Sequence, residues 1–361
     1  MFTLPAMYNL DPKKLAALSE AGESFVFTPD RASQAFVEYV ERFQGARKVS
    51  WGCKTLDNRV VTPMAPGEVT TLIARPGSGK TSLMVYLARR EALRCDVTKG
   101  ECVIYVTWEE PVESIEMSIQ SGTNYTSEEI AFGTVDIEKV KAASTSRGSL
   151  PLIIIGRSLM SQFDTSVESR PLYIETVRNA ILSIFKEYEL RPTLICGDYI
   201  QSVPFDQKIY RGDRTAAVTD AMLNISSLSR EVVAPFLLGA QSTRAPEKYK
   251  LPIPLLSDAQ WASIIEQESF RTISLLRPQT LIDPGQTSEN KTVQLYGVEY
   301  EVNKNLLLLA LLKQRKYSPP RNLFAVHFEP DTFKMMDIDT ATKQPYVAPE
   351  YAEEFDFRIE A

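Results

Sequence analysis

The sequence is poor in the residues that most often build metal centres and disulfide frameworks. It has one histidine, His327, and four cysteines, Cys53, Cys95, Cys102 and Cys196, with no CxxC spacing among them. A zinc site or a disulfide scaffold needs clusters of these residues, so neither class is supported. We assign no chemistry to the cysteines.

Long apolar runs are also missing. The longest candidate, LLLLALL at 306–312, is far shorter than the roughly 20 residues that a membrane-spanning helix requires. The opening residues, MFTLPAMYNLDPKKL, lack the basic cluster, apolar core and small-residue cleavage site of a secretory signal. We therefore expect a cytoplasmic protein without membrane contact.

The chain has no excess of positive charge. Its 40 lysines and arginines stand against 46 acidic residues, which leaves a net charge of -6. A passive nucleic-acid coat is usually basic, so any contact with DNA or RNA must come from local basic patches. With 44% hydrophobic and 24% charged residues, the composition matches soluble globular proteins and excludes wholesale disorder.

From residue 67 onward, short apolar strands alternate with helical patterns. This alternation predicts an α/β fold with a mostly parallel central sheet and helices on both faces. Later apolar segments with hairpin-like turns between them predict antiparallel strands that extend the sheet. The predicted strands are 67–74, 102–108, 150–156, 193–198, 236–241, 271–278, 293–302, 305–315 and 322–330, and the predicted helices are 81–95, 112–120, 127–145, 171–189 and 215–233.

Three regions are predicted along the chain. An N-terminal arm, 1–47, contains a linker helix at about 31–44 whose apolar stripe could pack on its own domain or on a neighbouring subunit. An ATPase motor domain spans 48–340. The acidic tail, 341–361, is either solvated or a peptide that docks on a partner. The arm and the tail are the candidate contacts with protein partners.

The segment from Ala74 to Thr81 reads ARPGSGKT, which fits a P-loop with alanine at the first glycine position. Its backbone N–H groups would wrap the phosphates, Lys80 would reach the β and γ oxygens, and the Thr81 hydroxyl would bind Mg²⁺. An apolar strand enters the segment and a helix leaves it, as a P-loop requires. The predicted nucleotide contacts are Arg75, Pro76, Gly77, Ser78, Gly79, Lys80, Thr81 and Ser82.

Polar residues stand where the neighbouring predicted strands end. Asp198 ends TLICGD, the expected position of the acid that helps to hold Mg²⁺. Glu109 and Glu110 follow VIYVTW, and one of them should orient the attacking water. Gln241 ends FLLGAQ, where it can sense the γ-phosphate. The order of P-loop, glutamate, aspartate and glutamine is typical of RecA-like ATPases.

Six motifs together carry a resemblance to a known family. They are ARPGSGKT, VTWEEP, LICGDYIQ, GAQSTR, LSDAQWASIIEQE and LLKQR, in this order. The chain resembles the RecA-like ATPase motor domain of DnaB-type replicative hexameric helicases over roughly 48–335. The segment VSWGCKTLDNRVVTPMAPGEVTTLIA resembles the stretch that introduces that motor.

The resemblance implies a homo-oligomer, a hexameric ring with ATP and Mg²⁺ at each interface. Carried over by position, Glu109 is the water-activating glutamate, Asp198 the Mg²⁺ acid and Gln241 the sensor. Lys313 and Arg315 of KQR are the basic pair that reaches the γ-phosphate of the neighbouring subunit. A finger supplied across an interface makes hydrolysis depend on assembly.

Two loops would hold single-stranded DNA in the pore of such a ring. The first follows Asp198 and contains Lys208, Arg211 and Arg214, and the second follows Gln241 and contains Arg244, Lys248 and Lys250. Each combines three basic residues with a tyrosine, the composition expected of a phosphate-tracking loop.

Several features depart from the family pattern. The N-terminal helical domain that seats primase has no counterpart in the about 47 residues before the motor. Gln260, Trp261 and Ala262 stand where the helicases usually carry Arg-Glu-Ser, Ser263 stands at a usual glycine, and Pro319-Pro320 follows KQRK.

Three functions stay open. The first is a DnaB-like helicase or translocase driven by ATP hydrolysis. The second is a non-unwinding RecA-like ring or filament, recombinase-like or regulatory, that acts on a protein or DNA partner. The third is a binding module that uses nucleotide as a structural switch.

Overall fold

The computed structural model describes residues 27–57, 60–121, 125–160, 171–244, 251–282, 291–315 and 322–352. Its contacts divide the chain into two units, 1–47 and 48–361. The first unit contains helix α2 (Pro29–Gly45), close to the predicted bounds of 31–44. Proline is tolerated in the first turn because its missing N–H would have no partner there. Within α2 the rings of Tyr39 and Phe43 stack with their centroids 5.5 Å apart.

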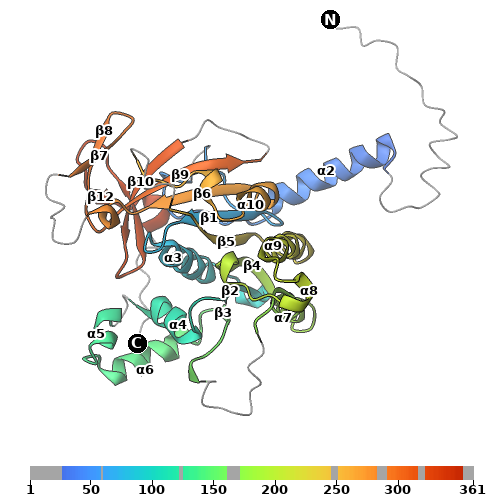
Figure 1. Ribbon diagram of the computed structural model, residues 1–361, viewed down its shortest axis with the longest axis horizontal. Helices are drawn as coiled ribbons and strands as arrows, with labels where there is room; N and C mark the ends of the chain where they lie inside the picture. Colours follow the sequence, from blue (N-terminus) through green and yellow to red (C-terminus); the bar gives the residue numbers. More distant parts are fainter. Residues whose placement is uncertain are drawn as a thin grey trace, which may run out of the picture. The chain divides into compact units, whose positions relative to one another are not determined.

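The second unit is built on a ten-stranded sheet (Figure 1). Its strands, in spatial order, are β12 (Pro345–Tyr346), β11 (Lys334–Ile338), β10 (Asn322–Glu329), β9 (Leu306–Gln314), β6 (Arg271–Leu276), β1 (Val69–Ala74), β5 (Phe236–Gln241), β4 (Arg191–Asp198), β2 (Glu101–Thr107) and β3 (Leu152–Ile155). Every pair from β6 to β3 is parallel, and every pair from β6 to β12 is antiparallel. The predicted fold class is therefore confirmed.

Two details of the predicted antiparallel extension are wrong. The sequence places the segment 271–278 in it, but β6 pairs parallel with β1, and the antiparallel part begins at β9. The segment 293–302 forms a separate two-stranded ribbon of β7 (Thr292–Leu295) and β8 (Val298–Glu301). Only Leu295 is buried in these two strands, so they lack the apolar face that a place in the main sheet requires.

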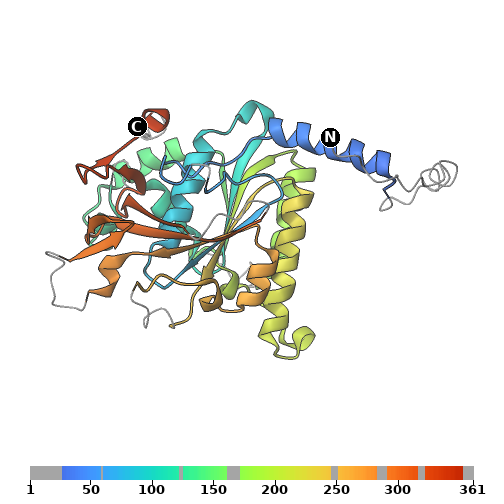
Figure 2. The same ribbon diagram turned by 90° about the horizontal axis from the view of Figure 1, so that it is seen from above.

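Helices cover both faces of the sheet (Figure 2). On one face, α3 (Lys80–Leu93) and α4 (Val112–Gln120) bury Leu83, Leu87 and Ile115 against Leu72 and Tyr105. On the other face, α7 (Ile174–Lys186), α9 (Arg214–Glu231) and α10 (Ala262–Glu268) pack through an apolar cluster that contains Val177, Ile225, Ile265, Ile73 and Leu238. Burial on both faces explains why the central strands read as continuous apolar runs.

The helical stretch predicted at 127–145 is two helices, α5 (Ser127–Ala131) and α6 (Ile137–Arg147). The chain turns at Gly133, which has a φ of 64°, a conformation that glycine adopts without the steric cost of a side chain. Asp136 then caps the second helix by accepting a hydrogen bond from the Glu138 N–H at 3.0 Å.

The described part of the predicted tail lies against the motor unit. Strand β12 pairs with β11, and the Tyr351 hydroxyl donates to Oδ2 of Asp57 at 3.1 Å. Asp57 also accepts from the backbone N–H groups of Trp51 and Gly52. Residues 345–351 therefore tie the end of the described chain to the segment that precedes β1. Among the described residues, no helix has the length and apolar character needed to cross a membrane.

Candidate nucleotide site

The P-loop follows β1 at the carboxyl edge of the parallel strands. Gly77 and Gly79 have φ values of 75° and 86°, and α3 begins at Lys80 directly after them. These left-handed glycines turn the chain sharply between strand and helix, which points the first N–H groups of α3 outward. The predicted contact residues from Arg75 to Ser82, with the exception of the buried Ser78, line a cavity of about 310 Å³.

Asp198 lies beside the P-loop, as β4 is separated from β1 by β5 alone. Its Oδ1 lies 3.1 Å from Nζ of Lys80, and its Oδ2 accepts from the Thr81 hydroxyl at 2.5 Å. Gly239 of β5 permits this approach, because a Cβ there would meet Asp198 Oδ1 and Lys80 Cδ, each at 3.0 Å. Lysine, threonine and aspartate are thus brought together from two distant segments.

The Thr81 hydroxyl and the Asp198 carboxylate form a hard-oxygen donor set that fits Mg²⁺. This ion usually takes one or two protein oxygens and fills its remaining positions with phosphates and water. The described residues contain no group of three or more His, Cys, Asp and Glu side chains that could hold a metal ion. A site made by two protein oxygens and a nucleotide is therefore the arrangement that these residues can offer.

Both candidate glutamates face the same cavity. Glu109 and Glu110 follow β2 and line the cavity together with the P-loop. Burial raises the pKa of each side chain; the nearby Lys80 opposes this effect at Glu109, and Asp198 adds to it at both. A carboxylate with a raised pKa is a better proton acceptor. The structure brings both glutamates to the site and leaves the choice between them open.

Gln241 ends β5 and also lines the cavity. Two further residues there are not among those predicted from the sequence. The centroid of the Tyr199 ring lies 3.7 Å from Nζ of Lys80, and Arg277, which follows β6, lies against Gly79. Arg277 was recognisable in principle, since it ends an apolar strand that could have been assigned next to β1.

Arg277 is a partly buried cation, two of whose donor nitrogens are buried. Its Nε and Nη2 have no hydrogen-bond partner among the described residues. Burial lowers the pKa of its guanidinium, and Asp331 opposes that effect. The guanidinium carbon lies 6.0 Å from the centroid of the Phe328 ring. A buried donor without a partner is costly, so a ligand anion in the cavity is the natural acceptor.

Lys313 and Arg315 lie away from the cavity of their own chain. They stand at the end of β9, where Lys313 is in register with Thr272 and the Arg315 N–H donates to the carbonyl of Phe270. Their side chains donate to the carbonyls of Glu266 and Gln267 in α10. Burial and the adjacent Arg315 lower the pKa of Lys313.

This position is the opposite edge of the sheet from the P-loop. Arg271 pairs with Thr70, near the start of β1, whereas the P-loop leaves the far end of that strand. Through Thr272, Lys313 is level with Thr71, three residues before the end of β1, which is roughly 10 Å at 3.3 Å per residue. Lys313 and Arg315 are not among the residues that line the P-loop cavity of their own chain.

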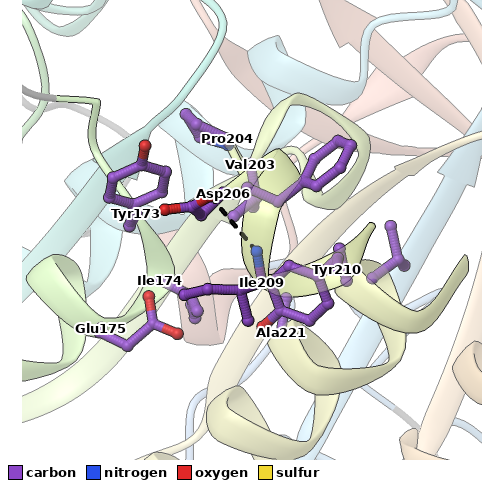
Figure 3. A pocket seen from close by; sticks show the side chains of 12 residues that line it. Tyr173, Ile174, Glu175, Val203, Pro204, Asp206, Ile209, Tyr210 and Ala221 are labelled. Carbon is purple, nitrogen blue, oxygen red and sulfur yellow. Dashed lines mark hydrogen bonds between the residues drawn. The ribbon is translucent and has the colours of Figure 1, made fainter. Parts of the chain in front are cut away.

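The first candidate DNA loop is a folded element. It contains helix α8 (Gln207–Tyr210), and the Tyr210 hydroxyl donates to Asp220 of α9 at 2.8 Å. Ile174, Ile209 and Tyr210 line a pocket of about 110 Å³, and Figure 3 shows their side chains close together. Lys208 and Arg211 are exposed on this element. Arg214 donates to the Gln201 carbonyl, and its guanidinium lies over the rings of Phe205 and Trp261.

The second candidate loop is described only at its ends. Arg244 is exposed just after the Ser242 and Thr243 positions that follow β5, whereas Lys248 and Lys250 lie outside the described residues. The contacts at its base are backbone hydrogen bonds, from Thr243 N–H to the Asp258 carbonyl at 2.7 Å and from Ser242 N–H to the Ala74 carbonyl at 2.9 Å.

The sheet order and the residues on its carboxyl edge define a RecA-like P-loop protein. Within that class, the chain belongs to the family of DnaB-like helicase C-terminal domains, whose sequence profile matches residues 49–328.

The curated relatives are replicative DNA helicases DnaB. The protein of Mycoplasma genitalium is 26% identical over 270 residues, which cover 74% of this chain and 52% of the relative. The Mycoplasma pneumoniae protein is 25% identical over 282 residues, covering 76% and 54%. The chain thus spans about half the length of the curated relatives it matches.

Solved structures show the same fold. One of them, a solved ATPase domain, aligns with a TM-score of 0.65 at 16% identity, over 87% of this chain and 100% of that one. A DnaB-like replicative helicase, from a structure that reports its interactions with primase, aligns with a TM-score of 0.64 at 17% identity, over 89% and 70%.

Proposed function

We propose that the chain is an ATP-driven motor that hydrolyses ATP between subunits of a homo-oligomeric ring, a hexamer, and moves on single-stranded DNA. The observation that carries this proposal is the placement of Lys313 and Arg315 on the sheet edge opposite their own P-loop. A basic pair that cannot serve its own nucleotide is useful if a neighbouring subunit presents its cavity to that edge. Family membership supports the same assignment.

The geometry and the charges of the cavity support the following roles for its residues. The P-loop N–H groups, Lys80 and Arg277 bind and orient the phosphates. Thr81 and Asp198 would hold Mg²⁺, which would neutralise charge on the phosphate oxygens. Glu109, or alternatively Glu110, accepts the proton of the water that attacks the γ-phosphorus as the bond to the bridging oxygen breaks. Gln241 contacts the γ-phosphate and registers its loss.

The neighbouring subunit completes the site. Its Arg315 and Lys313 bring positive charge to the oxygens that become more negative in the transition state. The linker helix α2, with its apolar stripe, is the element that we assign to contact between subunits. The folded element 204–214 and the residues after Gln241 supply the positive charge for DNA, and Lys208, Arg211 and Arg244 are exposed.

A steady-state ATPase assay with and without single-stranded DNA tests this function. We expect DNA to raise the ATPase rate several-fold. The two basic segments follow directly after Asp198 and Gln241, so DNA bound to them can influence the residues at the nucleotide cavity. A rate that single-stranded DNA leaves unchanged at every concentration would contradict the motor.

The second candidate is a non-unwinding ring or filament of RecA type. It is favoured by Trp261, which has a left-handed φ of 59° and stands where the helicases usually carry a glutamate. The guanidinium of Arg214 lies over the Trp261 ring, which carries no charge, whereas a glutamate would place a carboxylate there. A strand-displacement assay on a forked duplex separates the two candidates, because only a helicase releases the displaced strand in an ATP-dependent manner.

A further inference from the structure

Gln201 connects two strand ends that are not hydrogen-bonded to each other directly. It lies in the short helix η3 (Ile200–Ser202) after Asp198, and its side chain is 6% exposed. Its Oε1 accepts from the Gln241 N–H at 3.0 Å, and its Nε2 donates to the Gln241 carbonyl at 3.3 Å. The register between β4 and β5 ends at Gly197 and Leu238, so this side chain continues the link beyond the last strand pair.

The contacts around Gln201 form a closed circuit. The Gln201 carbonyl accepts from the guanidinium of Arg214, which lies 5.8 Å from the ring centroid of Trp261. The residue before that tryptophan, Gln260, donates its N–H to the Gln241 carbonyl at 3.3 Å. The circuit joins the cavity residue Gln241 to Arg214 on one side and to Gln260 and Trp261, which directly precede α10, on the other.

The circuit leaves little freedom for independent motion. Gln241 cannot shift along its strand without moving η3 or breaking two hydrogen bonds whose groups are largely buried. A buried donor or acceptor left without a partner is disfavoured, so the joint movement is preferred. The pocket in Figure 3 lies against the same segment. Val203 and Pro204 line it together with Ala221 of α9, so a movement of the segment 203–214 also changes its contacts with α9.

We propose that the Gln201 side-chain amide is a positioning group that couples nucleotide occupancy at Gln241 to the conformation of the basic segment 203–214. The proposal deepens the function proposed above and rests on it for the DNA role of that segment. Coupling of this kind requires two arrangements that the ligand distinguishes, and the amide transmits the difference by holding the two backbones together.

Limited trypsin digestion tests the coupling without DNA. Lys208 and Arg211 are exposed cleavage sites within the segment. In the full chain, a non-hydrolysable ATP analogue with Mg²⁺ should change the cleavage rate at these two bonds by about fivefold or more, the lower range of allosteric coupling. Gln201→Leu, which removes both hydrogen bonds at similar volume, should bring the ratio with and without analogue close to one.

Gln207→Leu on the exposed face of α8 is the matched control and should keep the wild-type ratio. Analogue affinity and cooperative thermal unfolding are measured for each variant. The proposal would be overturned if Gln201→Leu showed the same cleavage ratio as the wild type. It would also be overturned if the analogue did not change the cleavage rate of the wild type. Loss of analogue binding in Gln201→Leu would also overturn it, because the residue would then support the cavity itself.

An ATPase assay with and without single-stranded DNA separates this inference from the proposed function. In Gln201→Leu the ratio of DNA-stimulated to basal ATPase rate should fall toward one, while the basal rate and the KM for ATP stay near wild type. If single-stranded DNA did not stimulate the wild-type enzyme, the proposed motor function would be contradicted. The digestion experiment would still test the coupling. Stimulation that is equal in wild type and Gln201→Leu would overturn the coupling alone.

Discussion

At the residue scale, Arg277 is the side chain whose environment most clearly indicates a bound ligand. Its Nε and Nη2 are buried without partners among the described residues, 2.9 Å separates Nη2 from the position of a Cβ on Gly79, and the residue lines the cavity. Hydrogen bonds to a charged group contribute about 1.5–3 kcal/mol. Arg277→Ala should therefore raise the KM for ATP roughly tenfold to hundredfold.

Steady-state kinetics over a range of ATP concentrations measure this change. Arg191→Ala, at the exposed start of β4, removes the same charge at a distance from the cavity and should leave KM unchanged. An Arg277→Ala enzyme with the KM of the wild type would show that this arginine packs against the P-loop without binding nucleotide.

The two glutamates can be distinguished by pH as well as by rate. Removal of a general base costs about 10²–10⁴ in rate, so either Glu109→Gln or Glu110→Gln should show a loss in that range and the other a smaller one. Burial raises the pKa of both carboxyl groups, and the base must be deprotonated to accept a proton. Activity should thus fall as pH decreases through a value above that of an ordinary glutamate.

A pH profile of kcat measures this acid limb. The limb should be present in the wild type and absent from the residual activity of the variant that lacks the base. If both variants keep the limb and most of the rate, neither glutamate is the base.

At the scale of elements, the folded segment that contains α8 determines which basic side chains can reach DNA. Lys208, Arg211 and Arg214 are all exposed, but Arg214 is held by a hydrogen bond to the Gln201 carbonyl. Each phosphate contact with a single strand contributes about 0.7 to the slope of log affinity against log salt. Lys208→Ala/Arg211→Ala should weaken DNA binding and reduce that slope by about 1.4.

Fluorescence anisotropy with labelled single-stranded DNA at several salt concentrations gives the slope. The exposed pair Lys139 and Lys141 of α6 provides a control variant, Lys139→Ala/Lys141→Ala, with the same change in net charge. Equal slopes in the wild type and Lys208→Ala/Arg211→Ala would remove this segment from the DNA path.

The pairing of the C-terminal segment with the start of the motor unit also predicts a stability change. Tyr351 donates to Asp57, whose pKa is raised by burial, and this hydrogen bond opposes the raised pKa. Tyr351→Phe removes the donor alone and should destabilise the fold by about 0.5–1.5 kcal/mol. The midpoint of urea unfolding measures this, with the exposed Tyr188→Phe as control. Identical midpoints for both variants would indicate that the hydroxyl contributes nothing.

The strands and helices that sequence alone predicted well are those with a strong period and two buried faces. β1, β2, β4 and β5 are continuous apolar runs, so their type and parallel pairing follow from burial. The prediction was wrong for β6 because a strand has no intrinsic direction relative to a neighbour; tertiary packing beside β1 decides it. The break at Gly133 was readable from the glycine and from the capping residue Asp136 that follows.

The candidate site was predictable where a motif has a fixed local geometry. The P-loop, Asp198 and Gln241 each follow a strand that their own flanking residues predict, and the structure brings them together at one edge of the sheet. Arg277, and Gln201 behind the cavity residue Gln241, make their contacts with segments far away in the chain. Their neighbours, Gly79 and Gln241, become apparent only once the order of β6, β1, β5 and β4 is known.

At the scale of the whole molecule, the separation of Lys313 and Arg315 from their own P-loop makes assembly testable by mixing. Lys80→Ala removes a phosphate contact on one face, and Arg315→Ala removes the finger on the other, so each variant alone should lose nearly all ATPase activity. In a mixed ring, an Arg315→Ala subunit with an intact P-loop can lie against a Lys80→Ala subunit with an intact finger. With random assembly at equal amounts, roughly one interface in four is then complete.

The expected result is recovery of about a quarter of the wild-type rate in the equimolar mixture, with the maximum at equal proportions. Coupled ATPase measurements across a series of mixing ratios, with the subunits allowed to exchange, provide the curve. Lys80→Ala mixed with the double variant Lys80→Ala/Arg315→Ala is the control and should remain inactive, because no subunit then has a working P-loop. A flat curve at the level of the separate variants would mean that Arg315 acts within its own chain or has no part in hydrolysis.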